Sequence, residues 1–347
     1  MLAPPLSAPA FRSLPMVREA RPAPAEVVRP SARSVRLSIT DRCDFACTYC
    51  RPSKNDGYAE TQLDLAAWET LVDGLTRSGV RRFRLTGGEP LLHPKIVDIV
   101  RQIAAREVED LAITTNASRL ERLALPLKEA GLHRLNISID SLDPVRFAEM
   151  TRGGKLERVL RGIDAALDAG FRPIKLNAVI LRGQNDEEME ALVQFAWSRG
   201  MIPRFLEIMP IAEGARMVKE HLVTVAEMRT RIAHLLEPGP LVAEPDRGPA
   251  RYVKARENPA LGVGFISGTS DTYCESCDRL RVSSTGMLRP CLATDDGVDA
   301  SAAANEQRAD DLPGLLDRAW AMKPDGRTFK GCTESSAANL SMRGIGG

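Results

Sequence analysis

The chain has 347 residues, a hydrophobic content of 44% and a formal charge of +1. This length can bury a large core and hold two domains. A charge near zero argues against partners recognised through a global field, such as nucleic acid or an anionic membrane surface. No apolar run reaches the roughly 18 residues of a membrane span. We therefore expect a soluble protein that binds neither nucleic acid nor a membrane.

Residues 1–30 are rich in proline and alanine and show no apolar periodicity. This composition predicts a disordered extension. A transit peptide is the alternative because arginines recur there, but Glu19 and Glu26 weaken that interpretation, and no apolar segment indicates secretion.

From residue 35 to about residue 209, short apolar runs alternate with amphipathic helical stretches. We expect strands at 35–39, 82–85, 111–114, 134–139, 174–180 and 203–208. We expect helices at 63–76, 94–105, 118–130, 144–169 and 186–198. This alternation indicates an α/β fold with a parallel sheet, but periodicity alone does not separate a barrel from an open doubly wound sheet. The less regular region from about residue 244 predicts a smaller second domain.

The cysteines are odd in number, seven in all, which disfavours a closed disulfide framework. Three of them, Cys43, Cys47 and Cys50, follow the first expected strand with the spacing C-x3-C-x2-C. Three thiolates can hold three corners of a 4Fe–4S cube, whereas four cysteines usually close such a cluster. The fourth iron would stay open, which marks a reactive site. A zinc site is the alternative, but such sites usually have four ligands and the next downstream histidine is His93.

A second group, Cys274, Cys277 and Cys291, has the spacing C-x2-C-x13-C. Zinc ribbons often begin with C-x2-C, so zinc is the alternative here too. We favour an auxiliary 4Fe–4S cluster, again with one open iron. Cys332 stands apart as a structural or surface thiol, or as a distant fourth ligand. The grouping fits metal chemistry in a reducing cytoplasm.

Basic residues adjoin the second cysteine group. Arg279 and Arg281 occupy alternate positions of an extended segment, so they point the same way, and their forked donors suit phosphate. A solvated strand edge is the ordinary alternative. Further basic residues on separate expected strands can converge inside one barrel, namely Arg36, Arg84, Lys175 and Arg204.

Four features together are similar to the GTP 3′,8-cyclase family of radical S-adenosylmethionine enzymes. They are the first cysteine loop after Thr40-Asp41-Arg42, the segment Arg84 to Pro90 with its Gly87-Gly88-Glu89-Pro90, the second cysteine group with its arginines, and the terminal double glycine. The resemblance runs from about Ser34 to Gly347. It implies an incomplete (β/α)6 TIM-like barrel over 31–243 and a smaller C-terminal domain over 244–347 that carries the auxiliary iron–sulfur cluster and closes one mouth of the barrel.

The resemblance also implies roles for individual residues. The first and second cysteine groups hold two 4Fe–4S clusters. S-adenosylmethionine is contacted by Tyr49, Gly88, Ser138 and Met209. GTP is contacted by Arg36, Arg84, Thr114, Lys175, Arg204, Arg279 and Arg281, and the last two share a catalytic role with Gly346 and Gly347. Two positions depart from the family pattern: Ala117 follows Asn116 where glycine is general, and Arg51 stands where an apolar residue is common.

The implied reaction is the cyclisation of GTP to (8S)-3′,8-cyclo-7,8-dihydroguanosine 5′-triphosphate, the first step of molybdenum cofactor biosynthesis. In the family, a deoxyadenosyl radical removes hydrogen from C3′ of the ribose, the carbon radical attacks C8 of guanine, and reduction completes the ring. The resemblance further implies a homodimer, a reducing electron donor and transfer of the product to cyclic pyranopterin monophosphate synthase. A radical enzyme that modifies a peptide and a non-catalytic zinc-binding module are the alternatives.

Overall fold

The computed structural model describes residues 34–55, 57–244, 248–274, 277–294, 296–324 and 342–345. All of them belong to one compact unit, Ser31–Gly347. The predictions for the extension 1–30, for Cys332 and for Gly346 and Gly347 fall outside the described residues.

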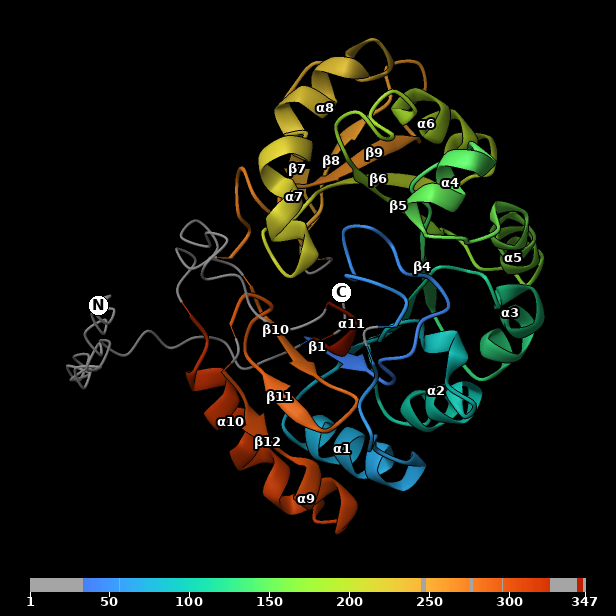
Figure 1. The fold of residues 1–347 in the computed structure, drawn as a ribbon. Coiled ribbons are helices and arrows are strands. Elements are labelled where there is room, and N and C mark those ends of the chain that lie inside the picture. Colours follow the sequence, from blue (N-terminus) through green and yellow to red (C-terminus); the bar gives the residue numbers. More distant parts are fainter. Residues whose placement is uncertain are drawn as a thin grey trace, which may run out of the picture. The chain divides into compact units, whose positions relative to one another are not determined.

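The first part of this unit alternates strands and helices as predicted. Its elements are β1 Ser34–Ser38, α1 Leu65–Arg77, β2 Arg82–Thr86, η1 Pro90–Leu92, α2 Ile96–Ala104, β3 Asp110–Thr115, α3 Leu120–Glu129, β4 Arg134–Ser138, α4 Pro144–Met150, α5 Leu156–Asp168, β5 Lys175–Ile180, α6 Met189–Ser198 and β6 Ile202–Glu207. Strands β1 to β6 pair in parallel, each with the next. In Figure 1 they follow an arc whose outer side is covered by helices α1, α2, α3, α5 and α6.

The single helix predicted over 144–169 is wrong, because the chain breaks there into α4 and α5. Arg152 and Gly153 both adopt positive φ, 53° and 103°. A side chain on Gly154 would lie 2.5 Å from the Thr151 hydroxyl. The apolar spacing continues across the break, so periodicity alone misses it, whereas the Gly153-Gly154 pair is a turn signal.

The remaining strands extend the same sheet at both edges. The elements are α7 Glu213–His221, α8 Val225–Arg231, η2 Ala233–Leu235, β7 Val242–Ala243, β8 Arg251–Lys254, β9 Gly262–Ile266, β10 Arg279–Val282, β11 Met287–Arg289, β12 Val298–Asp299, α9 Ser301–Asn305, η3 Ala309–Asp311, α10 Leu312–Ala321 and α11 Met342–Ile345. Strand β10 runs parallel to β1, and β9 runs parallel to β6. The described strands thus form one open sheet, in the order β12-β11-β10-β1-β2-β3-β4-β5-β6-β9-β8-β7. The prediction of an incomplete α/β barrel with a C-terminal part is confirmed.

The main core fills the space between the sheet and its outer helices. In α1, Trp68, Leu71 and Leu75 recur at helical spacing and are buried, and the Asp64 carboxylate caps the helix by accepting from the Ala67 amide at 2.8 Å. Burying each such apolar side chain contributes about 2–3 kcal/mol. None of the helices in the described ranges is long and apolar enough to cross a bilayer.

Along each strand, side chains point alternately into this core and toward the inner side of the arc. Val35 and Leu37 of β1 are fully buried, while Arg36 between them is only partly buried. The same pattern in β2 leaves Arg84 between Phe83 and Leu85. Because successive side chains of a strand point to opposite faces, the arginines face the inner side of the arc.

Candidate active site

A cavity of about 250 Å³ lies on the inner side of the sheet. Its walls come largely from the carboxyl ends of the parallel strands and the loops that follow them, where α/β folds usually bind ligands. The predicted site residues that line it are Arg36, Cys43, Cys47, Tyr49, Cys50, Arg84, Gly88, Thr114, Ser138, Arg204, Met209 and Arg281. Of the other predicted residues, Arg279 lines a neighbouring cavity with the second cysteine group, and Lys175 is not among the residues that line the main one.

The double glycine after β2 is required by a close approach of two loops. A Cβ on Gly87 would lie 2.2 Å from the Thr40 carbonyl oxygen, and one on Gly88 would lie 2.3 Å from that of Arg42. The Gly88 amide donates to the Thr40 carbonyl at 2.7 Å. The glycines therefore seat the β2 loop against the start of the cysteine loop, where any side chain would clash.

Glu89 ties the loop after β2 to the loop after β3. Its carboxylate accepts hydrogen bonds from the Leu91 amide (3.0 Å), the Thr115 hydroxyl (2.7 Å) and the Asn116 amide (2.7 Å). Burial raises the pKa of Glu89 to about 7, although these hydrogen bonds favour its charged form. The Glu89 carboxyl group lines the cavity at this position.

The first cysteine group fits an iron–sulfur cluster by the chemistry of its donors. Cys43, Cys47 and Cys50 form no disulfide and line one cavity. Burial raises the pKa of Cys43 and Cys47, so bare thiolates are disfavoured, whereas a bound metal would stabilise them. Within the described ranges, no three His, Cys, Asp or Glu side chains are placed to hold a single metal ion. A cluster does not require such convergence, because each thiolate binds its own iron.

Backbone contacts anchor the cysteine loop to the turn after α4. The Ala46 amide donates to the Thr151 carbonyl at 3.1 Å, and the Thr48 amide donates to the Met150 carbonyl at 2.9 Å. These two bonds fix the loop backbone on either side of Cys47.

Arg51, which departs from the family pattern, adds a side-chain clamp to this loop. Its guanidinium donates to the carbonyls of Cys43 (3.3 Å), Phe45 (3.1 Å) and Lys54 (2.9 Å). The other departure, Ala117, adopts φ 61°, a conformation that glycine reaches at lower cost. The alanine thus keeps the backbone conformation that the family's glycine would favour.

Three arginines form one row across neighbouring strands. The register places Arg36 of β1 beside Arg84 of β2 on one side and beside Arg281 of β10 on the other. Burial lowers the pKa of all three. Repulsion from nearby cations adds to the effect: Arg281 and Arg84 act on Arg36, Arg204 and Arg134 act on Arg84, and Arg279 acts on Arg281. They nevertheless stay charged at neutral pH. A desolvated row of like charges is costly in the free protein, so it favours a bound polyanion.

Arg204 of β6 adds a fourth cation to the cavity. Its Nε donates to the Asn177 side-chain oxygen, and its Nη2 donates to that of Asn136, both at 2.8 Å. Burial lowers the pKa of Arg204. The two amides orient the guanidinium without cancelling its charge.

Lys175 of β5 occupies a separate buried position. Its Nζ lies 4.0 Å from the Glu244 carboxylate and 5.5 Å from the centroid of the Tyr252 ring. Burial lowers the pKa of Lys175 to about 7, and the nearby Arg204 and Arg134 add to the effect. This lysine therefore changes charge near neutral pH.

The second cysteine group lines a smaller cavity, of about 40 Å³, together with Arg279 and Lys323. Three residues, Tyr273, Arg281 and Leu292, line both this cavity and the main one. The two cavities therefore adjoin. Burial raises the pKa of Cys274. Burial acts the same way on Cys277, but the positive charges of Arg279 and Lys323 outweigh it and lower that pKa to about 7.

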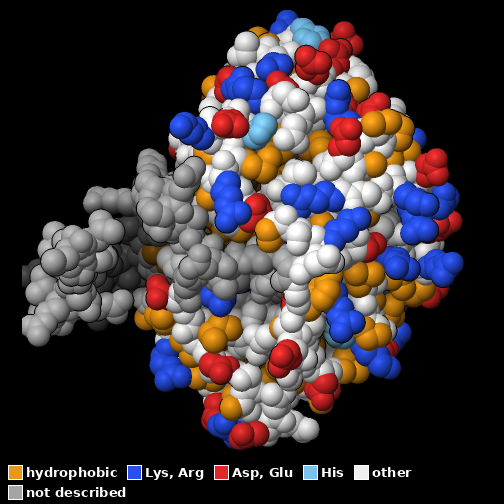
Figure 2. Space-filling model, in the orientation of Figure 1, with side chains coloured by type: hydrophobic (Ala, Val, Ile, Leu, Met, Phe, Trp, Pro, Cys, Tyr) orange, Lys and Arg blue, Asp and Glu red, His pale blue; other side chains and the backbone are white. Residues whose placement is uncertain are grey.

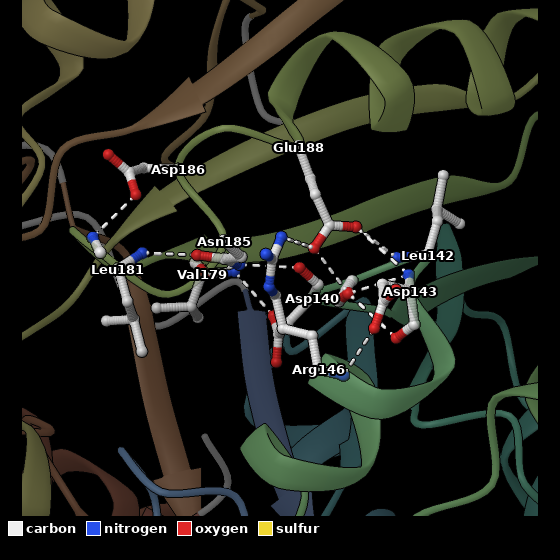
Figure 3. A network of polar contacts seen from close by, with 11 residues as sticks. Asp140, Leu142, Asp143, Arg146, Val179, Leu181, Asn185, Asp186 and Glu188 are labelled. Carbon is white, nitrogen blue, oxygen red and sulfur yellow. Dashed lines mark hydrogen bonds and ion pairs between the residues drawn. The ribbon is translucent and has the colours of Figure 1, made fainter.

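Sequence reasoning missed several residues that line the main cavity, among them Asp140, Asn177, Glu207 and Tyr273. Asp140 belongs to a network that joins the loops after β4 and β5 (Figure 3). In this network the Glu188 carboxylate accepts from the Ser141 hydroxyl and the Leu142 amide. The signal in the sequence that could have found such residues is their position along the chain. Polar residues that directly follow a buried strand commonly face the ligand.

The surface contrasts with this concentration of inner cations. On the face seen in Figure 2, described acidic and basic side chains are interspersed. The exposed charged side chains on this face are thus of both signs, whereas most of the charged side chains that line the cavity are positive.

Comparisons with known proteins find matches to both parts of the chain. Residues 37–196 match the profile described as Radical SAM superfamily, and residues 201–329 match that of Molybdenum Cofactor Synthesis C. The GTP 3′,8-cyclase 1 of Pseudomonas aeruginosa is 43% identical over 306 residues, which cover 86% of this chain and 92% of that protein. The GTP 3′,8-cyclase of Pelotomaculum thermopropionicum is 40% identical over 301 residues, 84% of this chain and 91% of the relative.

A solved structure gives independent evidence on the fold. Streptococcus suis SuiB bound to S-adenosylmethionine superposes with a TM-score of 0.60, over 88% of this chain and 72% of that one. Its identity of 16% limits the comparison to architecture.

Proposed function

This chain belongs to the GTP 3′,8-cyclase family of radical S-adenosylmethionine enzymes, and on that premise we propose that it cyclises GTP to 3′,8-cyclo-7,8-dihydro-GTP in the first step of molybdenum cofactor biosynthesis. One observation carries the proposal: a single cavity is lined both by three cysteines and by a row of arginines. Thiolates suit a cluster and guanidiniums suit phosphates, so both reactants find their ligands at one site.

We propose two 4Fe–4S clusters, one held by Cys43, Cys47 and Cys50 and the other by Cys274, Cys277 and Cys291. When bound, the first cluster and S-adenosylmethionine supply the one-electron chemistry that opens the C3′–H bond of the ribose. On the protein side, S-adenosylmethionine would be contacted by Tyr49, Gly88, Ser138 and Met209.

The chain's own contribution is to hold GTP and to exclude water. We propose that the triphosphate is held by Arg36, Arg84, Thr114, Lys175, Arg204, Arg279 and Arg281. The adjoining cavity at the second cysteine group offers a place for the base. Fixing GTP at both ends would bring C3′ and C8 together and remove much of the entropic cost of ring closure.

The terminal Gly346 and Gly347 are proposed to reach this site. Support comes from Met342 of α11, which lines the main cavity, and from the contact of α11 with β1. Deleting both glycines should abolish the cyclised product while the iron and sulfide content stays at the wild-type level. Unchanged turnover in the shortened enzyme would contradict the role of the tail.

Further proposals concern the setting of the reaction. We propose that 31–243 form the barrel domain and 244–347 the domain that carries the second cluster. We also propose a homodimer, an external reducing donor, transfer of the product to cyclic pyranopterin monophosphate synthase and a cytoplasmic location. The six described cysteines form no disulfide, which supports a reducing compartment.

The test is anaerobic incubation of reconstituted protein with GTP, S-adenosylmethionine and dithionite, followed by mass spectrometry. We expect 5′-deoxyadenosine together with an isomer of GTP. Deoxyadenosine without consumption of GTP would point to another substrate, such as a peptide, whereas zinc without acid-labile sulfide would overturn the cluster assignment. The double variant Arg279→Ala/Arg281→Ala should lose GTP affinity, whereas no such loss is expected for an enzyme that acts on a peptide.

A further inference from the structure

We propose that Asp140 is a positioning residue that orients the Tyr49 ring and thereby shapes the part of the cavity that receives S-adenosylmethionine. This inference rests on the proposed function. It adds a residue for which neither the sequence nor the family resemblance suggested a role.

Asp140 and Tyr49 form a direct hydrogen bond at the wall of the cavity. The Tyr49 hydroxyl donates to Asp140 Oδ2 at 2.7 Å, and both residues line the cavity. Asp140 is only 4% exposed. Burial raises the pKa of Asp140 to about 6, so the carboxylate is mostly charged at neutral pH. Such charge-assisted hydrogen bonds are stronger than neutral ones.

The surroundings of Asp140 fix its carboxylate. Oδ1 accepts from the Val179 amide at 2.8 Å, so each carboxylate oxygen has a partner. The backbone of Asp140 is held as well, because the Asn185 side chain donates to the carbonyls of Asp140 (2.7 Å) and Val179 (2.9 Å). The side-chain oxygen of Asn185 accepts from the Leu181 amide at 2.8 Å. Asn185 is fully buried, and Figure 3 shows it beside Val179 and Asp140. Asp140 is therefore a rigid anchor for the phenol.

The cysteine loop does not depend on this bond for its own position. Its backbone is anchored by the Ala46 and Thr48 amides, and by the carbonyls that Arg51 binds. The Tyr49–Asp140 bond is thus an additional restraint that acts on the ring rather than on the loop. Losing it should free the ring while the neighbouring cysteines stay in place.

The experiment is a double-mutant cycle on the reconstituted full chain with Tyr49→Phe, Asp140→Ala and both together. The readouts are the Kd for S-adenosylmethionine from anaerobic equilibrium dialysis, the iron and sulfide content, and the KM for GTP. We expect each single variant to raise the Kd about tenfold, which corresponds to one such hydrogen bond. The double variant should raise the Kd no further, because the same bond is lost. Cluster content and the KM for GTP should stay unchanged.

Two further variants sharpen the result. Asp140→Asn keeps the shape and can still form a neutral hydrogen bond, so its Kd should lie between those of the wild type and Tyr49→Phe. Tyr58→Phe is the matched control, because the Tyr58 hydroxyl donates to the Cys43 carbonyl at 3.4 Å but Tyr58 does not line the cavity. It should leave the Kd unchanged.

A wild-type Kd in Tyr49→Phe, or additive effects in the double variant, would overturn the role of Asp140. If Asp140→Ala does not fold, Tyr49→Phe decides alone, since it removes a single oxygen. Failure of the wild-type protein to bind S-adenosylmethionine would instead overturn the proposed function.

Discussion

At the scale of single residues, the site is a set of arginines whose positive charges lie close together with little access to water, which costs free energy. Arg36, Arg84 and Arg281 stand side by side in the register, and burial together with repulsion from nearby arginines lowers the pKa of each. Residues that only stabilise a fold are rarely arranged in this way, because like charges with little access to water oppose folding. The arrangement is explained when a polyanion completes it.

Arg36→Met should therefore separate binding from stability. The thioether keeps the apolar stem and removes the charge, so the unliganded protein should be no less stable than the wild type. The Kd for GTP should rise about 10- to 100-fold, as expected for one charge-assisted contact. Calorimetric titration and thermal unfolding measure the two quantities.

The control for this variant is Arg161→Met, which removes an exposed arginine whose Nε lies 3.1 Å from Glu121. Such surface pairs contribute little to stability, so both quantities should stay near the wild-type values. A lower melting temperature for Arg36→Met with unchanged GTP affinity would assign Arg36 to the structure rather than to the substrate.

Lys175 should make GTP binding depend on pH. Its pKa is lowered to about 7 in the free protein, whereas a bound phosphate favours the protonated form. Below pH 7 the lysine is already charged. As the pH rises above 7, binding must first protonate it, so affinity should fall roughly tenfold between pH 7 and 8.5. Calorimetry in buffers of different ionisation enthalpy should detect proton uptake.

Lys175→Met is the control for this pH dependence. In this variant, the affinity for GTP can change with pH only through the titration of the nucleotide and of the other residues. Equal pH profiles for the two proteins would exclude Lys175 from the phosphate site.

At the scale of elements, the sequence predicted those structural features that depend on local residue patterns. Strands β1 to β6 were found where apolar runs placed them, and the cysteine spacing located both thiol groups on cavity walls. The break between α4 and α5 was missed because the apolar period continues through it. The pairing of β10 with β1 and of β9 with β6 was also not predicted, since no local pattern records which distant strands meet.

The same reason explains the residues of the site that escaped prediction. Asp140 and Asn185 act through hydrogen bonds between the loops after β4 and β5. Arg84 and Arg204 were singled out as basic residues on separate expected strands, but only the family resemblance implied that they contact GTP, because an arginine in a strand has no distinctive local pattern. Their common direction became visible only with the register.

Asn185 is the residue on which the arrangement of these two loops depends most. Asn185→Ala removes three hydrogen bonds and leaves their buried backbone partners unsatisfied. We expect it to lower the free energy of unfolding by about 3 kcal/mol, measured as a shift of the urea midpoint. The exposed neighbour Glu187 offers a control, since Glu187→Ala should change stability by less than about 0.5 kcal/mol. Equal midpoints for the two variants would show that the network is not needed for stability.

At the scale of the whole molecule, the C-terminal strands complete the sheet rather than form a separate one. Strands β9 and β10 cover the free edges of β6 and β1, and helices α9 and α10 contact α1. The substrate site shares this dependence, because Arg36 and Arg84 lie on the first strands and Arg281 lies on β10. Folding and function therefore draw on both ends of the unit.

A fragment of residues 31–243 should consequently fail to form a stable monomer. It would expose two long edges of a parallel sheet and the apolar face of α1 that α10 covers, and open edges promote aggregation. The chain of residues 31–347 should remain folded, because it is one compact unit. Size-exclusion chromatography and urea unfolding of both chains test this expectation. A monomeric fragment 31–243 with cooperative unfolding would show that the barrel is autonomous.

The pairing of β1 with β10 also bears on how the protein is made. A chain leaving the ribosome presents β1 first among its strands, yet the parallel neighbour on one side of β1 is synthesised near the end. Pairings so distant in sequence form slowly and leave intermediates that aggregate, so a nascent chain would need chaperone protection over most of its translation. A product of stalled translation would carry the first three cysteines but lack Arg281. Late completion of the sheet thus means that a half-made chain does not have the complete set of phosphate-binding arginines.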